Sequence, residues 1–207
     1  MYEEVRVLTH SSIKITGEKV LYFDPYEVAE EWHDADVIFV THDHFDHFSP
    51  EDIRKVQKEG TLLVLPECMK GQEAKQSVAN VRFVNPSETI EVAGLTVQTV
   101  AAYNRMKPFH LKGKGYVGYL VTMAGVTYYV AGDTDITPEN QQVSCDVALV
   151  PAGGKFTMNY KEAAELVNRI EPKLAIPTHY GTVAGSVEDG ERFAQLVREG
   201  IEVRRFI

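Results

Sequence analysis

Four side chains with metal-ligating groups lie within six residues of one another, directly after an apolar run. In an extended segment alternate side chains share a face, so this spacing brings imidazoles and a carboxylate together. A helix start predicted just afterwards would turn the backbone and add a fourth group. Two imidazoles on one cation and an Asp-His pair on a second is a geometry that this spacing can build. The four residues are His42, His44, Asp46 and His47.

The donor types indicate which ions would bind. Imidazole and carboxylate without thiolate suit Zn, Mn, Fe or Ni, and we expect two divalent ions, with Zn as the first choice. The competing interpretation is a polar turn in which Asp46 caps a helix and the histidines are solvated. Four such side chains beside a buried strand would be costly unless something binds them, which favours the metal site. Asp43 and Phe45 have the opposite parity and are expected to pack or to support the ligands.

Further ligands must come from other parts of the chain, because six residues rarely fill two coordination shells. Asp133 and His179 each follow an apolar run that predicts a strand, and His110 lies in the loop before another. Strand ends at one edge of a sheet can place such side chains together on a rigid scaffold. His10, at the end of the first predicted strand, competes with His110 for one coordination place.

The elements that must position these residues alternate between strands and helices. Short apolar runs separated by turn residues predict strands over residues 5–8, 13–15, 20–23, 37–40, 62–65, 81–84, 95–101, 116–123, 126–131, 147–150, 174–176 and 201–203. Capping residues and helical spacing predict helices from Ser49 to Gly60, from Pro66 to about Ser77, after Asn159, and from Ser186 to Gly200. Residues 103–115 have no regular period and predict a loop.

This alternation predicts an α/β fold (α+β by some schemes) in which two sheets pack together and helices lie outside. No Ser/Gly-rich or charged linker divides residues 1–207, so we expect a single domain. The 44% hydrophobic content can fill one sizeable core.

Net charge excludes some classes of protein. With 21 Lys and Arg against 30 Asp and Glu, the formal charge is −9, which makes a nucleic-acid partner or an anionic membrane surface unlikely. The sequence lacks an apolar run of the roughly 20 residues needed to span a membrane and begins without a signal-peptide pattern, so we expect a cytoplasmic protein. We expect a small-molecule substrate as partner, and both a monomer and a homo-oligomer remain open.

Several motifs resemble those of a known family. His42-x-His44-x-Asp46-His47, Gly132-Asp133-Thr134 and Thr178-His179-Tyr180-Gly181 resemble the metallo-β-lactamase-fold hydrolases. The segments 9–12, 23–25, 102–104 and 151–154 look like the ascorbate-phosphate-lactonase-like branch of metal-dependent hydrolases. The likeness covers essentially the whole chain, and the histidine motif is specific for the superfamily but says little about the substrate.

The resemblance implies a four-layer αββα sandwich, the metallo-β-lactamase fold, with a binuclear metal site. The chain is too short for the additional helical domain of glyoxalase II-type thioesterases. His44 stands where flavodiiron oxygen reductases have Glu, which argues against redox chemistry. The implied ligands are His42, His44 and His110 on one metal, Asp46, His47 and His179 on the other, and Asp133 as a bridge.

Such a site predicts hydrolysis by a metal-bound hydroxide, because two cations lower the pKa of a shared water from 15.7 towards about 7. Asp133 and Asp46 are the expected catalytic residues, Asp133 as the bridge and Asp46 as a proton shuttle. The expected substrate is a small ester, lactone, amide or phosphoester, either anionic or neutral. The alternatives are a nuclease acting on RNA or DNA ends, and a metal-binding protein without turnover.

Two residues are candidates for substrate binding. Tyr103 could donate a hydrogen bond to a developing oxyanion, as could Tyr180 or Lys155. Lys112 belongs to a basic loop around His110 that would attract an anionic substrate. The alternative is a solvated loop whose charges only keep the protein soluble.

Overall fold

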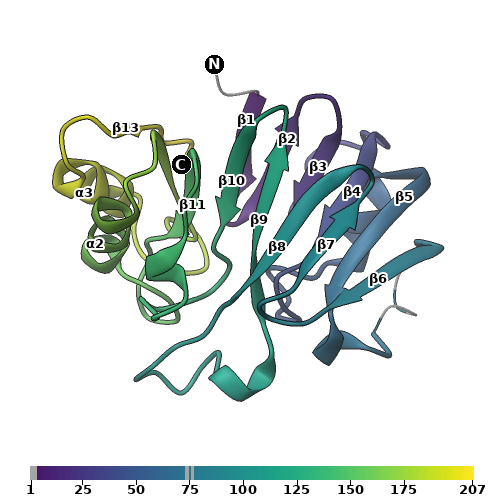
Figure 1. Cartoon of the computed structure of the whole chain (residues 1–207), viewed down its shortest axis with the longest axis horizontal. Helices are drawn as coiled ribbons and strands as arrows, with labels where there is room; N and C mark the ends of the chain where they lie inside the picture. The colour runs from purple at the N-terminus through teal and green to yellow at the C-terminus, as the bar shows by residue number, and fades with distance from the viewer. Residues whose placement is uncertain (1–3, 73–74, 76) are drawn as a thin grey trace.

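Two β-sheets form the centre of the molecule (Figure 1). The computed structural model describes residues 4–72, 75 and 77–207. The first sheet has the order β1-β2-β3-β4-β5-β6; its first three strands are an antiparallel meander, and β3 to β6 run parallel. Its strands are β1 (Glu4–Thr9), β2 (Ser12–Thr16), β3 (Val20–Phe23), β4 (Ala35–Phe39), β5 (Gln57–Pro66) and β6 (Asn80–Val84).

The second sheet has the order β13-β12-β11-β10-β9-β8-β7. Strands β7 to β10 are antiparallel neighbours, whereas β10 to β13 run parallel. Its strands are β7 (Thr89–Val92), β8 (Leu95–Ala101), β9 (Val117–Met123), β10 (Val126–Val130), β11 (Val147–Pro151), β12 (Leu174–Thr178) and β13 (Glu202–Val203).

Apolar side chains from the facing surfaces of both sheets form the central core. Phe23 and Phe39 stack at 4.8 Å, and Tyr119 of the opposite sheet packs on Phe39 at 5.0 Å. A second cluster lies between β11, β12 and the helices α2 (Tyr160–Ile170) and α3 (Glu188–Leu196). A third lies between β4, β5 and α1 (Pro50–Val56). Helices therefore cover the outer faces of a two-sheet sandwich, and the predicted mixed α/β fold is confirmed.

Local signals explain where the main helices begin. Ser49 caps α1 by accepting a hydrogen bond from the Asp52 backbone, with Pro50 in the first turn. Asn159 and Glu162 form a capping box at the start of α2. Single-turn 3₁₀ helices occur in the loops at Glu67–Met69, Lys112–Lys114 and Asn140–Gln142.

Several predicted boundaries were wrong. Helix α1 ends at Val56 because Gln57 already pairs with Ala35 and begins β5. The helix expected over residues 66–77 is only a 3₁₀ turn at its start, and residues 73, 74 and 76 lie outside the described part of the chain. Strand β7 was not predicted, because it alternates exposed and partly buried residues at a sheet edge. Helix α3 begins after Val187 rather than Ser186.

The chain direction brings many loops to one edge of the sandwich. Strands β1, β3 and β4 of the first sheet run the same way, as do β8, β10 and β12 of the second. The two edges meet, because the His179 amide donates to the His10 carbonyl at 3.0 Å and the Val117 amide to the Thr41 carbonyl at 3.2 Å. The polar segments that follow these six strands therefore surround one place.

One glycine is required for the two sheets to approach there. Gly132 has a φ of +64°, a conformation that L side chains rarely adopt. A Cβ on this residue would lie 3.0 Å from Cβ of Thr41, on the loop after β4. Gly132 thus keeps the loop that carries Asp133 against the loop that carries the histidine motif.

We expect Gly132→Ala to lower the free energy of unfolding by about 1 kcal/mol more than Gly125→Ala does. Gly125 is the matched control, since its φ is +77° but a Cβ there would meet nothing within 4 Å. Both variants share the cost of the left-handed backbone, and only Gly132→Ala adds the contact with Thr41. Urea unfolding of the two variants and the parent measures the difference; equal losses would contradict a close approach at Gly132.

Candidate metal centre

Four donor atoms form a first group at the edge of the sandwich. Nδ1 of His44 lies 3.1 Å from Nε2 of His42 and 3.0 Å from Nε2 of His110. Oδ2 of Asp133 lies 3.3 Å from His110 Nε2 and 3.8 Å from His42 Nε2. The four side chains could hold one metal ion.

A second group of four lies beside the first. Oδ2 of Asp46 is 3.2 Å from Nε2 of His10, 3.6 Å from Nε2 of His179 and 3.8 Å from Nε2 of His47. These four side chains are buried and could hold another ion. His10 was expected to compete with His110 for the first group, but its side chain lies in the second, with its ring 3.9 Å from that of His179.

The carboxylate of Asp133 lies between the two groups. Its Oδ1 is 3.2 Å from Nε2 of His47, and its Oδ2 is 3.1 Å from Nε2 of His179. Its Oδ2 also faces His42 and His110, as given above. The structure therefore brings together all seven residues predicted as metal ligands, with Asp133 in the middle.

Buried groups behind the histidines fix which ring nitrogen faces the centre. His47 Nδ1 lies 2.6 Å from Oδ2 of Asp24, a buried carboxylate that also accepts hydrogen bonds from the backbone and hydroxyl of Thr41. Nδ1 of His110 donates to the Phe156 carbonyl at 3.2 Å. In each case Nδ1 carries a proton, so Nε2 is the nitrogen that faces the centre and can bind a metal once it is unprotonated.

The ionisation of the groups reflects burial and mutual charge. Burial alone would lower the pKa of His179, but the carboxylate of Asp133 raises it to about 9. Burial is likewise outweighed at His47, where Asp133 and Asp24 raise the pKa well above its usual range. Burial and the charge of His47 lower the pKa of His42. The charges of His179 and His47 hold the pKa of Asp133 well below its usual range, although burial opposes them.

The donor atoms cannot all be satisfied by hydrogen bonds to one another, whereas a cation could satisfy them. Nε2 of His47 and of His179 and Oδ1 of Asp133 are buried and make no hydrogen bond of acceptable geometry. His44 Nδ1 can share one proton with only one of its two imidazole neighbours. Nitrogen ligands around a tetrahedral zinc with bonds of about 2.0–2.1 Å lie roughly 3.3 Å apart, close to the spacings in the first group. A divalent ion in each group would satisfy these atoms.

Three of the donor histidines have a left-handed backbone, as does His33, which is not a metal donor. The φ angles of His10, His110 and His179 are 49°, 52° and 56°, in the left-handed region. Each of the three follows a strand or lies in a loop at the shared edge. Such conformations cost about 1–3 kcal/mol each and cluster at functional sites, where the surrounding structure imposes them.

The two residues predicted to bind substrate lie away from the donor groups. The Tyr103 hydroxyl donates to Glu139 at 2.8 Å. The ammonium of Lys112 is 2.8 Å from the same carboxylate. Of the other loop cations, Lys107 pairs with Asp135. These charges are already matched by carboxylates of the protein.

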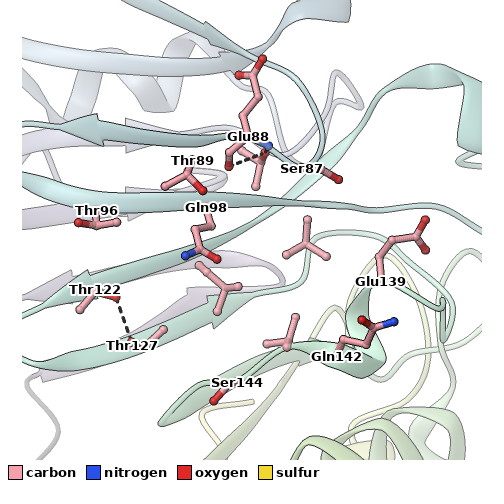
Figure 2. Close-up of a pocket in the computed structure, with 14 residues that line it drawn as sticks. Ser87, Glu88, Thr89, Thr96, Gln98, Thr122, Thr127, Glu139, Gln142 and Ser144 are labelled. Carbon is pink, nitrogen blue, oxygen red and sulfur yellow. Dashed lines mark hydrogen bonds between the residues drawn. The ribbon is translucent and has the colours of Figure 1, made fainter.

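Two pockets of similar volume differ in whether they reach the donor groups. A pocket of about 460 Å³ lies over β8, β9 and β10 and is lined mainly by hydroxyl and amide groups (Figure 2). Thr122 and Thr127 hydrogen bond to each other there at 3.0 Å. Its lining holds none of the metal-donor residues. A pocket of about 440 Å³ opens on both donor groups and includes His44, His110 and Asp133 in its lining. The pocket over the donor groups is therefore the candidate active site.

Comparison with known proteins shows the family of the chain. The model of the family described as "Beta-lactamase superfamily domain" matches residues 4–179. A UPF0173 metal-dependent hydrolase of Methanopyrus kandleri is 36% identical over 82% of this chain and 77% of its own. Another UPF0173 metal-dependent hydrolase, from Thermococcus kodakarensis, is 33% identical over 97% of this chain and 94% of its own.

A solved structure has the same fold as this chain. A protein of Parabacteroides distasonis assigned to the metal-dependent hydrolases superposes with a TM-score of 0.84 and 28% identity, over 97% of this chain and 91% of that one. Among the described residues no helix is long and apolar enough to cross a membrane.

Metal binding should release protons. His47 and His179 have raised pKa values in the metal-free protein, so at pH 7 each must lose a proton before its Nε2 can bind an ion. The zinc affinity of the second group should therefore rise with pH up to about 9, by about tenfold per pH unit for each proton displaced. Calorimetric zinc titration in two buffers of different protonation enthalpy counts the protons. A count of zero at pH 7 would contradict the raised pKa values.

Asp24→Asn should weaken the binding of one of two zinc equivalents by about 10- to 100-fold, because His47 loses the carboxylate that fixes its tautomer. Asp34→Asn is the matched control: Asp34 pairs with Lys14 and Tyr22 beside the start of β4, at the opposite edge of the sheet. Competition with a chelator of known affinity measures both constants. Parental affinity for both equivalents in Asp24→Asn would show that this carboxylate does not support the site.

Proposed function

The chain belongs to the beta-lactamase superfamily and to its metal-dependent hydrolases, and from this premise we propose that two divalent cations, Zn first among them, bind around Asp133 and that the protein hydrolyses a small molecule. The bond cleaved is that of an ester, lactone, amide or phosphoester. The observation that carries the proposal is the position of the Asp133 carboxylate between two groups of donor atoms.

The residues that would hold the ions follow from these distances. His42, His44 and His110 would hold one cation, and Asp46, His47 and His179 the other. The ions would supply a water of lowered pKa as nucleophile and positive charge for the oxygen that becomes negative.

The protein's own groups orient the ligand side chains and exclude water from the site. Asp24 and the Phe156 carbonyl hold His47 and His110 with Nε2 towards the centre. Asp46 would take the proton of the nucleophile once its own bond to the cation loosened. Nε2 of His10 lies 3.2 Å from Oδ2 of Asp46 and keeps that oxygen in place. Because most of these side chains are buried, the field of the site acts on the substrate with little screening by water.

A small-molecule substrate suits the surface better than nucleic acid does. Two of the four cations in the loop over residues 103–115, Lys107 and Lys112, are paired with Asp135 and Glu139. The net charge of −9 also opposes binding to a polyanion.

The direct test is metal analysis followed by a hydrolase screen. We expect about two zinc equivalents per chain, and hydrolysis of at least one ester, lactone, amide or phosphoester by the loaded protein. Asp133→Ala should bind at most one equivalent and lose at least about 10³-fold in kcat, because it removes the group shared by both ions. Glu59→Ala, an exposed carboxylate on β5 near the opposite edge, is the control.

The result that would overturn the proposal is equally clear. Parental turnover in Asp133→Ala, or one equivalent or fewer in the zinc-loaded parent, would show that two cations do not act together at this residue. Glu59→Ala should match the parent in both measurements, which separates loss of the site from loss of an acidic side chain in general.

A further inference from the structure

The pocket over the donor groups combines a polar floor with an apolar rim. Besides the metal-donor residues, its lining includes three phenylalanines and a valine. The three rings come from loops of both sheets: Phe45 from the loop after β4, Phe109 from the loop after β8, and Phe156 from the loop after β11. We call Phe45, Phe109, Phe156 and Val183 the apolar rim.

Two of these rings are unusually exposed for their size. Phe45 is 66% exposed and Phe109 is 42% exposed. Phe109 packs edge-on against Phe156 with ring centroids 4.9 Å apart, and Phe45 packs edge-on against Tyr26 at 6.0 Å. Exposed aromatic groups that adjoin a polar site mark the place where an apolar ligand binds.

The described residues that line the pocket add no protein cation to the charge of the metal centre. Among them there is no Lys or Arg. The carboxylate of Asp43, which does line the pocket, is held by hydrogen bonds from Tyr116 and Gln72. Lys155, a neighbouring cation, lies over the ring of Phe156 at 4.7 Å.

We propose that the substrate carries an uncharged aromatic or bulky aliphatic group next to the bond that is cleaved, and that this group binds among the rings of Phe45, Phe109 and Phe156. This inference rests on the proposed hydrolase function and narrows it. The polar floor takes the reacting bond and the apolar rim takes the neighbouring group, so the rim sets which substrates are used. An anionic group at the same position would face Asp43 without a protein cation among the lining residues.

Matched substrate pairs test the proposal on the zinc-loaded protein. Benzyl acetate and ethyl acetate share the acetyl ester and have leaving alcohols of similar acidity, so their kcat/KM ratio reports binding of the phenyl group. N-benzylacetamide with N-ethylacetamide, and a phenyl- with a methyl-substituted γ-lactone, extend the test to other bonds. We expect the parent to prefer the phenyl member at least about tenfold. Adding a para carboxylate to the benzyl group should cancel most of this preference.

Variants of the rim locate the preference. Phe45→Ala and Phe109→Ala should each reduce the phenyl-to-alkyl ratio by about three- to tenfold, the loss of one aromatic contact. Phe109→Leu should restore part of it. Phe206→Ala is the matched control, because Phe206 is also an exposed ring, at 39%, but lies outside the pocket lining. A variant that only disturbs the metal ligands would lower kcat/KM for both substrates of a pair by the same factor, so the phenyl-to-alkyl ratio would not change.

Three results would overturn the inference. The first is a parent without preference for the phenyl members, and the second is a ratio that Phe45→Ala and Phe109→Ala leave intact. The third is that light scattering gives a lower assembly mass for Phe109→Ala than for the parent while the phenyl-to-alkyl ratio of kcat/KM stays unchanged. That result would show that the rings contact another copy of the chain instead of a substrate.

A binding measurement separates this inference from the proposed function. If the zinc-loaded parent hydrolyses none of these substrate pairs, the proposed hydrolysis of these substrates fails. Binding to the rim can still be measured, by comparing benzyl alcohol with ethanol in saturation-transfer NMR. A signal for benzyl alcohol that is lost in Phe109→Ala supports the rim as an apolar binding site. No signal with the parent overturns it.

Discussion

The structure depends on a buried carboxylate that is surrounded by imidazole nitrogens. Asp133 lies within 3.8 Å of Nε2 atoms from four histidines, in a place that water hardly reaches. Buried polar atoms without hydrogen-bond partners lower the free energy of unfolding, so the stability of the fold does not account for this arrangement. Cations between the donors would satisfy the lone pairs.

The fold places these donors through strand direction. Strands that run the same way in both sheets end at one edge, and the loops after them carry the donors, the Asp24 carboxylate that supports His47, and the rings of the apolar rim. The helices lie on the outer faces of the sheets. Their packing stabilises the sandwich and leaves the loop edge free for chemistry. A rigid scaffold with variable loops can change its substrate while its metal ligands stay in place.

Much of the site could be predicted from sequence because its signals are local. The spacing of donor residues in 42–47 indicated a metal site, although the extended backbone assumed for this segment was wrong: residues 43–47 form a turn, in which the amides of His47 and Phe48 donate to the His44 carbonyl. Asp133 and His179 lie shortly after apolar strands, as predicted. The position of His10 could not be predicted, because it depends on how the ends of β1 and β12 meet across the two sheets. Lys112 lies two residues after His110 in sequence, yet it pairs with Glu139, 27 residues further along the chain.

The central claim is that two cations share the Asp133 carboxylate, and electron paramagnetic resonance of the manganese-loaded protein tests it most directly. Two Mn²⁺ ions bridged by one carboxylate lie within about 4 Å and couple magnetically. We expect a spin-coupled spectrum at two equivalents that is replaced by the six-line signal of isolated Mn²⁺ in Asp133→Ala. A spectrum of isolated Mn²⁺ in the fully loaded parent would contradict the shared carboxylate.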